Sequence, residues 1–326
     1  GLKKILIYVI MRPLNFNLNK GDKMKDFAFL FPGQGSQVVG MGKDLYEKSD
    51  FGKKTFKMAD DILGYYFSKI CFEGPEEELQ LTYNGQPALL TVSYILFNLL
   101  GQEPGIAAGH SLGEYSALLC SGAMKFEDAV LLVHKRGKYM QEAVPVGKGA
   151  MAALMGADVE RIKHVVKEVS KGNGRLGVAN WNGSGQVVIS GEKAAVEEAA
   201  RLIAARVTKF LPVSAPFHSK MMQPAEDKLA KDLDKTEFKD LAFPIINNIE
   251  TAEITKGNDA REGLKKQVTR PVYWHDTMLK FLEEKKIEKF AEIGSGKVLS
   301  GLAKRTAKEL NKEVEIRSIQ TLEDLT

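Results

Sequence analysis

The sequence contains very little cysteine: Cys71 and Cys120 are the only two in 326 residues. They form no Cys-x-x-Cys pair and no cluster with histidine, and no spacing typical of metal ligands appears elsewhere. This argues against a disulfide-stapled fold and against a structural zinc site. So little cysteine also favours the reducing cytoplasm as the compartment.

Apolar runs long enough to cross a membrane are also missing, because a spanning helix needs about 20 such residues. Residues 2–10 are basic and then apolar, as in a signal peptide, but the run is short and no small-residue cleavage site follows. We interpret residues 1–23 as an upstream extension or an expression remnant that can be removed without loss of activity, and Met24 as the native start. No association with a membrane is expected.

Neither sign of charge dominates the sequence. Lys and Arg number 46 and Asp and Glu 42, which gives a formal net charge of +4, and the two signs are interspersed. This mildly basic balance suits an acidic protein partner but is too weak for nucleic-acid binding. Hydrophobic residues at 44% and charged residues at 27% are typical of globular proteins, and the length suits a large domain, alone or with a smaller one.

Short apolar runs alternate with helical patterns over most of the chain. Before residue 143, we predict strands at 26–31 and 106–108 and helices at 86–100, 112–120 and 126–142. After residue 213, we predict a helix at 219–233 and strands at 243–247, 290–293 and 314–319. Strands that alternate with helices indicate an α/β domain with a largely parallel sheet.

The middle of the chain has a different rhythm. We predict strands at 150–155, 176–179, 186–190 and 207–213, and helices at 159–169 and 193–205. The resulting β-α-β-β-α-β order is typical of a ferredoxin-like unit. We therefore expect a ferredoxin-like domain at 146–213, inserted into a discontinuous larger domain that is formed by residues 24–145 and 214–326.

The most specific motif is a G-x-S-x-G pattern between a predicted strand and a predicted helix. It reads Gly109-His110-Ser111-Leu112-Gly113. In a nucleophile elbow the glycines permit a sharp turn, and the helix N-terminus offers N–H groups to a developing negative charge. Ser111 is thus our candidate nucleophile. The alternative is an ordinary capping serine at a glycine-rich helix start.

A nucleophilic serine needs a base, and the sequence offers five histidines. We expect four of them to lie elsewhere: His110 pointing away from the serine, His134 and His164 on solvated helix faces, and His275 in a polar stretch. His218 lies in a loop between a predicted strand and a predicted helix, just after Pro216-Phe217, and catalytic bases favour such loops. A lone loop histidine is more often solvated, but the elbow favours His218 as the base.

The acid of a hydrolase triad is not evident. Between Ser111 and His218 the acidic residues, such as Asp158 and Glu192, are scattered over helices and the flanks of the insert, and none follows a strand obviously. A Ser–His pair without a carboxylate is therefore the better interpretation. The imidazole then needs another acceptor, for example a backbone carbonyl.

Arg136 is placed where an arginine is unusual. On the helix predicted at 126–142 it shares one arc with Ala129, Leu132, Val133 and Met140. A buried guanidinium needs an anion, which is either a structural carboxylate or a substrate carboxylate held by two parallel hydrogen bonds. The helix alone leaves both partners open and favours the structural one.

Other glycine-rich segments differ in value. The turn at 32–37 follows the first strand and can present N–H groups, as the second half of an oxyanion hole or as a simple turn. The G-x-G-x-x-G at 172–177 precedes a strand and so fails the dinucleotide test, 294–297 lacks the full phosphate-loop spacing, and the glycosylation pattern at 182–184 has no secretory context.

These segments together resemble the malonyl-CoA:acyl carrier protein transacylase family of fatty acid synthesis. The resemblance runs from about residue 26 to about residue 322 and depends on motifs at 31–37, 109–115, 136–141 and 216–218, and on Gln267 ahead of 271–274. It implies a hydrolase-like α/β domain with a ferredoxin-like insert. It also implies that Ser111 accepts the acyl group and that His218 is the general base.

The resemblance assigns the remaining site residues as well. The backbone carbonyl of Gln267 would orient His218, the N–H groups of Gln34 and Leu112 would form the oxyanion hole, and Arg136 would hold the malonyl carboxylate. The implied reaction passes malonyl from CoA to Ser111 and then to the phosphopantetheine thiol of acyl carrier protein, without metal or redox cofactor. We expect a monomer whose partners are malonyl-CoA and acyl carrier protein.

Three alternatives stay open at this point. A serine thioesterase would use the same elbow but give the acyl group to water. An inactive acyltransferase-like module would only bind a carrier protein. A free-standing acyltransferase with the same chemistry would serve polyketide synthesis, and the sequence alone does not separate the two pathways.

Overall fold

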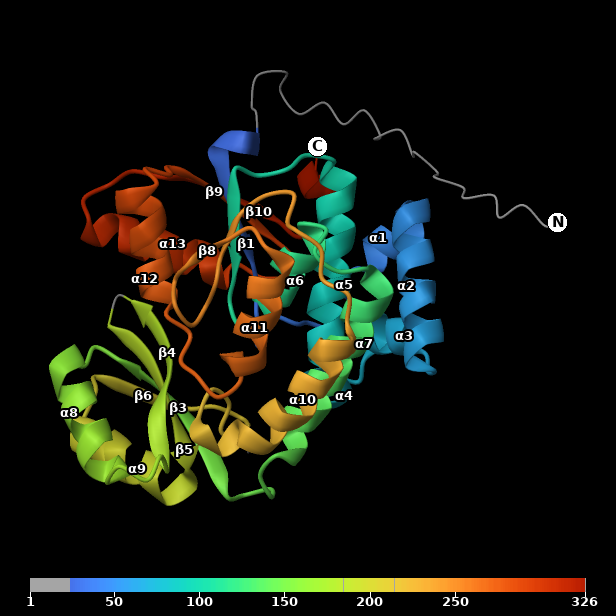
Figure 1. Cartoon of the computed structure of the whole chain (residues 1–326). Helices are drawn as coiled ribbons and strands as arrows, with labels where there is room; N and C mark the ends of the chain where they lie inside the picture. The colour runs from blue at the N-terminus through green and yellow to red at the C-terminus, as the bar shows by residue number, and fades with distance from the viewer. Residues whose placement is uncertain (1–23, 184, 214, 326) are drawn as a thin grey trace.

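The computed structural model describes residues 24–183, 185–213 and 215–325, so the extension expected at 1–23 lies outside the described residues. The main sheet follows the order β10-β9-β1-β2-β7-β8 (Figure 1). Its strands are β1 (Phe27–Phe31), β2 (Ile106–Gly109), β7 (Ile245–Ile246), β8 (Glu253–Ile254), β9 (Lys289–Ile293) and β10 (Glu315–Ile319). All neighbours are parallel except the antiparallel β7–β8 pair, which confirms an α/β fold with a largely parallel sheet.

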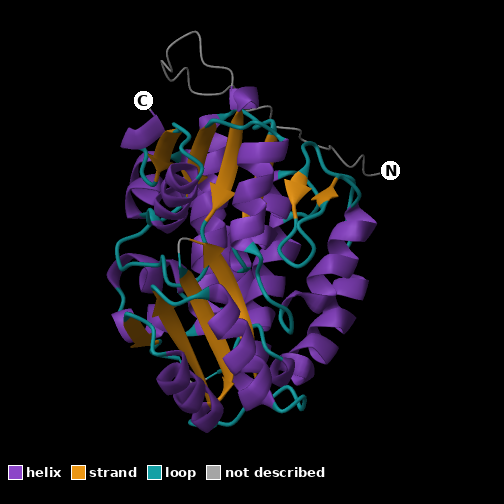
Figure 2. Cartoon of the chain, turned by 90° about the vertical axis from the view of Figure 1, so that its left-hand side faces the viewer, coloured by secondary structure: helices purple, strands orange, loops and turns teal. Residues whose placement is uncertain are grey.

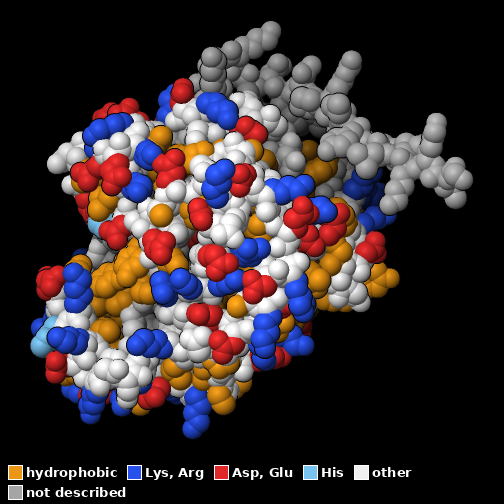
Figure 3. Space-filling view, viewed as in Figure 1, with side chains coloured by type: hydrophobic (Ala, Val, Ile, Leu, Met, Phe, Trp, Pro, Cys, Tyr) orange, Lys and Arg blue, Asp and Glu red, His pale blue; other side chains and the backbone are white. Residues whose placement is uncertain are grey.

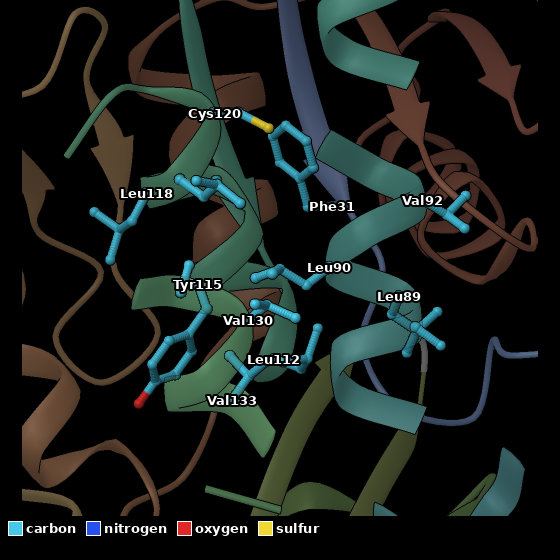
Figure 4. Close-up of a cluster of buried hydrophobic side chains, with 14 of the residues drawn as sticks. Phe31, Leu89, Leu90, Val92, Leu112, Tyr115, Leu118, Cys120, Val130 and Val133 are labelled. Carbon is cyan, nitrogen blue, oxygen red and sulfur yellow. The ribbon is translucent and has the colours of Figure 1, made fainter. Parts of the chain in front are cut away.

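The continuous apolar sequence of β1 is explained by burial on both faces of the strand. Phe27, Phe29 and Phe31 belong to one hydrophobic cluster, and Ala28 and Leu30 to another. Helices α5 (Thr82–Leu100), α6 (Leu112–Cys120) and α7 (Phe126–Glu142) contribute to the first cluster, part of which is shown in Figure 4. The second cluster is covered by α12 (Trp274–Leu279) and α13 (Val298–Glu309).

The main sheet and the helices around it form the larger of two units. Its remaining helices pack around the sheet and the helices already described (Figures 1 and 2). They are α1 (Lys43–Lys48), α2 (Asp50–Leu63), α3 (Phe67–Glu73), α4 (Glu76–Gln80), α10 (Gln223–Lys235) and α11 (Gly257–Gln267). Short 3-10 turns lie at Met24–Asp26, Lys220–Met222 and Glu323–Leu325, and a π-helical turn follows α12 at Lys280–Glu284. Helix α10 packs on α7, which carries Arg136, and on α11, which carries Gln267. The loop that leads into α10 carries His218.

The middle of the chain forms a separate antiparallel sheet with the order β4-β5-β3-β6. Its elements are β3 (Gly149–Met155), α8 (Val159–Ser170), β4 (Leu176–Gly183), β5 (Gln186–Glu192), α9 (Lys193–Ile203) and β6 (Val207–Phe210). They follow one another in the β-α-β-β-α-β order that the sequence pattern predicts. The two helices share one hydrophobic cluster with the sheet, whereas Met151, Ala153 and Val188 belong to the cluster of the large unit.

Two predicted strands are shorter in the structure. The strand predicted at 207–213 ends at Phe210, after which Leu211 N–H still bonds to Met151 but Val213 N–H turns back to Leu211. The strand predicted at 243–247 is reduced to β7, because Pro244 has no N–H and the Asn247 N–H bonds to the Ala252 oxygen in the turn to β8.

One face of the molecule shows no single field of charge. On the face in Figure 3, basic and acidic side chains lie intermixed over both units. Within the described part of the chain, no helix is both long enough and apolar enough to span a bilayer.

Candidate active site

The G-x-S-x-G motif forms a tight strand–turn–helix junction. Strand β2 ends at Gly109, α6 begins at Leu112, and Ser111 between them has a φ of 53°, which a non-glycine residue rarely adopts. A Cβ added to Gly109 would lie 1.9 Å from the carbonyl carbon of Gly113, and one on Gly113 would lie 2.0 Å from the Phe31 oxygen. The two glycines are therefore required by close backbone packing, which holds the half-exposed serine at the end of the strand.

Ser111 and His218, 107 residues apart, lie in direct contact. The Ser111 Oγ is 2.7 Å from His218 Nε2. The other ring nitrogen, Nδ1, lies 3.0 Å from the carbonyl oxygen of Gln267 and 3.1 Å from that of Arg270. Because carbonyls only accept, Nδ1 carries the proton, and the unprotonated Nε2 accepts from the serine hydroxyl. The family resemblance implies the Gln267 carbonyl, and the structure adds that of Arg270.

The surroundings of His218 keep its ring neutral. The residue is buried and has a φ of 55° in the loop that leads into α10. Burial, and then the positive charge of Arg136, lower the pKa of His218 to about 3. Its imidazole is thus in the proton-accepting form at neutral pH.

The other four histidines lie outside this contact. His110 Nε2 pairs with Asn182 Oδ1 at 2.9 Å and its ring packs on Trp274, His164 is exposed on α8, and His275 contacts Glu309 at 3.1 Å. The expectation of a solvated His134 is wrong. Its Nδ1 lies 2.9 Å from the Tyr83 carbonyl oxygen and its ring packs beside Tyr83, because α7 presents this face to the start of α5.

Arg136 is buried, with 1% of its surface exposed, and it points at the serine. Its Nη2 donates to Ser111 Oγ at 3.1 Å and to Gln267 Oε1 at 2.9 Å, and its Nη1 donates to Gln86 Oε1 at 2.7 Å. The Tyr115 ring lies under the guanidinium at 5.1 Å. No carboxylate of the described residues forms an ion pair with Arg136, and its Nε has no hydrogen-bond partner there. The structural carboxylate that the helix pattern favours is therefore not in direct contact with Arg136. The buried Glu114 acts on the guanidinium only across the Gln267 amide that lies between them.

The turn at 32–37 lies beside the elbow because β1 pairs with β2. Phe31 is opposite Gly109 in the register, and the His110 N–H donates to the Phe31 oxygen at 3.1 Å. The backbone N–H groups of Gln34 and Leu112 have no acceptor among the described residues. Two unpaired donors at adjacent strand ends are what an oxyanion hole requires.

Three further buried residues belong to the site, although the sequence motifs did not indicate them: Asn248, Glu114 and Gln86. Asn248 supports the elbow: its Oδ1 accepts from the Ser111 N–H and its Nδ2 donates to the Gly109 oxygen, both at 2.7 Å. Glu114 Oε2 accepts from Gln267 Nε2 at 2.7 Å and from the Asn248 N–H at 3.1 Å. Burial raises the pKa of Glu114 to about 7. Glu114 follows the elbow motif directly, whereas no local signal marks Asn248 or Gln86.

Comparison with known proteins shows which family the chain resembles. The model of the acyl transferase domain family matches residues 28–323. The malonyl CoA-acyl carrier protein transacylase of Bacillus subtilis is 46% identical over 306 residues, which cover 92% of this chain and 96% of that protein.

Solved structures agree in fold as well. An acyl carrier protein S-malonyltransferase from Vibrio cholerae is 41% identical with a TM-score of 0.87, over 92% of this chain and 98% of that one. A malonyl-transacylase solved in complex with its type II PKS acyl-carrier protein is also 41% identical, with a TM-score of 0.86 over 92% and 97%. With this similarity over nearly the whole chain, on a fold that brings serine, histidine and arginine together, the chain belongs to the malonyl CoA-acyl carrier protein transacylase family of acyl transferases.

Proposed function

We propose that this protein transfers a malonyl group from malonyl-CoA to the phosphopantetheine thiol of acyl carrier protein, for fatty acid biosynthesis. One observation carries the proposal. The Ser111 Oγ contacts both a neutral histidine and an arginine that has no ion-pair partner among the described residues. The first contact suits covalent acyl transfer, and the second suits an acyl group with its own carboxylate.

In the first half-reaction, Ser111 Oγ attacks the thioester carbonyl of malonyl-CoA while His218 Nε2 takes its proton. The N–H groups of Gln34 and Leu112 stabilise the oxyanion of the tetrahedral intermediate. The carbon–sulfur bond then breaks, the CoA sulfur receives the proton from His218, and a malonyl ester remains on Ser111. The Gln267 and Arg270 carbonyls hold the ring for both proton transfers.

The second half-reaction reverses these steps with a new thiol. His218 accepts the proton of the phosphopantetheine thiol, whose sulfur attacks the ester, and Ser111 Oγ leaves with that proton. The result is malonyl on the carrier, free enzyme and ping-pong kinetics. These steps need no metal and no redox cofactor.

Arg136 is suited to select malonyl. The three side chains that accept from its Nη groups, Gln86, Gln267 and Ser111, are all neutral. The guanidinium therefore has no direct ion-pair partner among the described residues. The buried Glu114 still acts on its charge across the Gln267 amide, and burial strengthens its pairing with a substrate carboxylate.

We also propose the protein partner, the oligomeric state and the cellular compartment of the reaction. The solved relative in complex with an acyl-carrier protein and the net charge of +4 support an acidic carrier as partner. A monomer is part of the same proposal. Cys71 and Cys120 are buried and unpaired, which supports a cytoplasmic protein. We propose neither a nucleic-acid partner nor a membrane one.

Mass spectrometry of the intact protein tests the function. We expect a malonyl adduct after brief mixing with malonyl-CoA, its transfer to holo acyl carrier protein, and no adduct in Ser111→Ala. An adduct that is lost to water without carrier would indicate a thioesterase, and carrier binding without any adduct would indicate a binding module. Parallel assays with a fatty acid carrier and a polyketide carrier separate the two pathways by their relative transfer rates.

A further inference from the structure

Glu114 is a buried carboxylate that the reaction steps above do not use. It lies in the first turn of α6 with 2% of its surface exposed, and no Lys or Arg of the described residues forms an ion pair with it. Its Oε2 accepts two hydrogen bonds, from Gln267 Nε2 and from the Asn248 N–H. Its cation is Arg136, which acts on it across the Gln267 amide without direct contact. A buried carboxylate in this position is costly, so its contacts point to a specific role.

The amide of Gln267 can adopt only one orientation in this site. Its Nε2 faces three acceptors: Glu114 Oε2 at 2.7 Å, the Ser111 carbonyl oxygen at 3.1 Å and Asn248 Oδ1 at 3.4 Å. Its Oε1 faces Arg136 Nη2 at 2.9 Å. A flipped amide would place oxygen against these acceptors and NH₂ against a guanidinium that only donates.

We propose that Glu114 is a positioning residue for malonyl selection. It fixes the Gln267 amide so that Oε1 holds Arg136 Nη2 beside Ser111 Oγ. Of the three acceptors around Nε2, Glu114 makes the shortest contact, and it also accepts the backbone N–H of Asn248, which supports the elbow. Glu114 thus connects the serine turn and the arginine through one carboxylate. The inference rests on the proposed function.

The role of Glu114 depends on the reach of its oxygen and less on its charge. One oxygen makes both contacts, and burial raises the pKa of Glu114 to about 7, close to neutrality. A glutamine has the same length and an amide oxygen that accepts equally. An aspartate keeps the charge but is one methylene shorter and cannot reach both N–H groups without movement of the backbone.

Glu114→Gln and Glu114→Asp therefore form a matched pair. The measured quantity is the ratio of kcat/KM for malonyl-CoA to that for acetyl-CoA in formation of the acyl-enzyme. We expect Glu114→Asp to lower this ratio roughly tenfold or more, mainly through a higher KM for malonyl-CoA, and Glu114→Gln to lower it about threefold at most. The opposite order would show that charge matters more than reach, and it would overturn the proposal.

A double-mutant cycle tests whether Glu114 acts through Gln267. Gln267→Met removes the amide but keeps the backbone carbonyl that orients His218. We expect Gln267→Met to lose malonyl selectivity, measured as the same ratio, and Glu114→Asp to change the ratio less than about twofold in that background. If Glu114→Asp lowers the ratio equally in the wild type and in Gln267→Met, the proposal is overturned. Full malonyl selectivity in Gln267→Met would also overturn it, and this measurement is decisive even if Glu114→Asp does not fold. Failure of the proposed function is separate, since the wild type would then form no malonyl adduct.

Discussion

At the scale of single residues, the site concentrates around one oxygen atom. Ser111 Oγ lies within hydrogen-bond distance of a proton acceptor, His218 Nε2, and of a cation, Arg136 Nη2. The two neighbours affect each other, because the positive charge of Arg136 is the second cause of the low pKa of His218. Selection of the substrate and activation of the serine are thus coupled electrostatically.

Replacing Arg136 tests its part in selection. We expect Arg136→Ala to lower kcat/KM for malonyl-CoA on the order of a hundredfold, because the substrate carboxylate loses a buried charged partner, and to affect acetyl-CoA far less. Lys135→Ala is the matched control, since the neighbouring Lys135 points to Asp232 on α10, at 2.9 Å, and not to the serine. Unchanged malonyl selectivity in Arg136→Ala would contradict the role.

The pH dependence of acylation tests the state of His218. Because its pKa is lowered to about 3, the base stays unprotonated as the pH falls through the usual range of histidine near 6.5. We therefore expect kcat/KM for acetyl-CoA to lack an acid limb near that pH. Arg136→Ala removes one of the causes that lower the pKa of His218, so we expect the acid limb of the profile to move to higher pH in this variant. A wild-type limb centred at the usual histidine value would show that His218 is not the base in this state.

At the scale of elements, the site depends on how closely α6 approaches β1. Gly113→Ala would place a Cβ 2.0 Å from the Phe31 oxygen, so the first turn of α6 would have to move away from the strand. We expect a loss of about 3 kcal/mol or more in the free energy of unfolding, measured by urea denaturation, together with loss of acyl-enzyme.

A glycine in open space provides the control for this change. Gly301 lies inside α13, and an added Cβ there meets nothing within 4 Å. Gly301→Ala should stabilise the protein by about 0.5–1 kcal/mol through helix propensity and leave the acyl-enzyme unaffected. A similar loss of stability in both variants would argue against the close approach of α6 as the cause.

At the scale of the whole molecule, the two sheets are tied together at the site. Val272 follows the segment that orients His218, and its N–H and carbonyl bond to Ala179 and Trp181 of β4 at 2.8 and 2.9 Å. Side chains of the small sheet, such as Met151 and Val188, also belong to the main hydrophobic cluster. We infer that the two units unfold together.

The two tryptophans report on the two units separately, because Trp181 lies on β4 and Trp274 on α12. In Trp274→Phe only the small sheet contributes tryptophan fluorescence, and in Trp181→Phe only the large unit does. Within each variant we expect fluorescence and far-ultraviolet circular dichroism to give the same urea midpoint. Distinct midpoints within either variant would show that the units unfold independently.

Much of this arrangement could be predicted locally. Sequence patterns within about twenty residues predict the elbow, the boundaries of α6 and α7, and the buried position of Arg136 on its helix. They do so because backbone turns and helix faces are set by near neighbours in the sequence. The half-buried position of His134 could not be predicted, since it depends on the start of α5, about fifty residues earlier. The contact of His218 with the Arg270 carbonyl could not be predicted either, because the two residues lie about fifty positions apart in the sequence.

Local periodicity and turn chemistry are sufficient to predict the alternation of strands and helices, the serine at a sharp turn, and the candidates His218 and Arg136. Long-range packing determines which groups meet Ser111 Oγ, that the arginine donates to two neutral amides, and that Glu114 and Asn248 brace the turn. These contacts join segments from 25 to 156 residues apart. Their geometry follows from the packing of the sheet and its helices, and no local pattern records it.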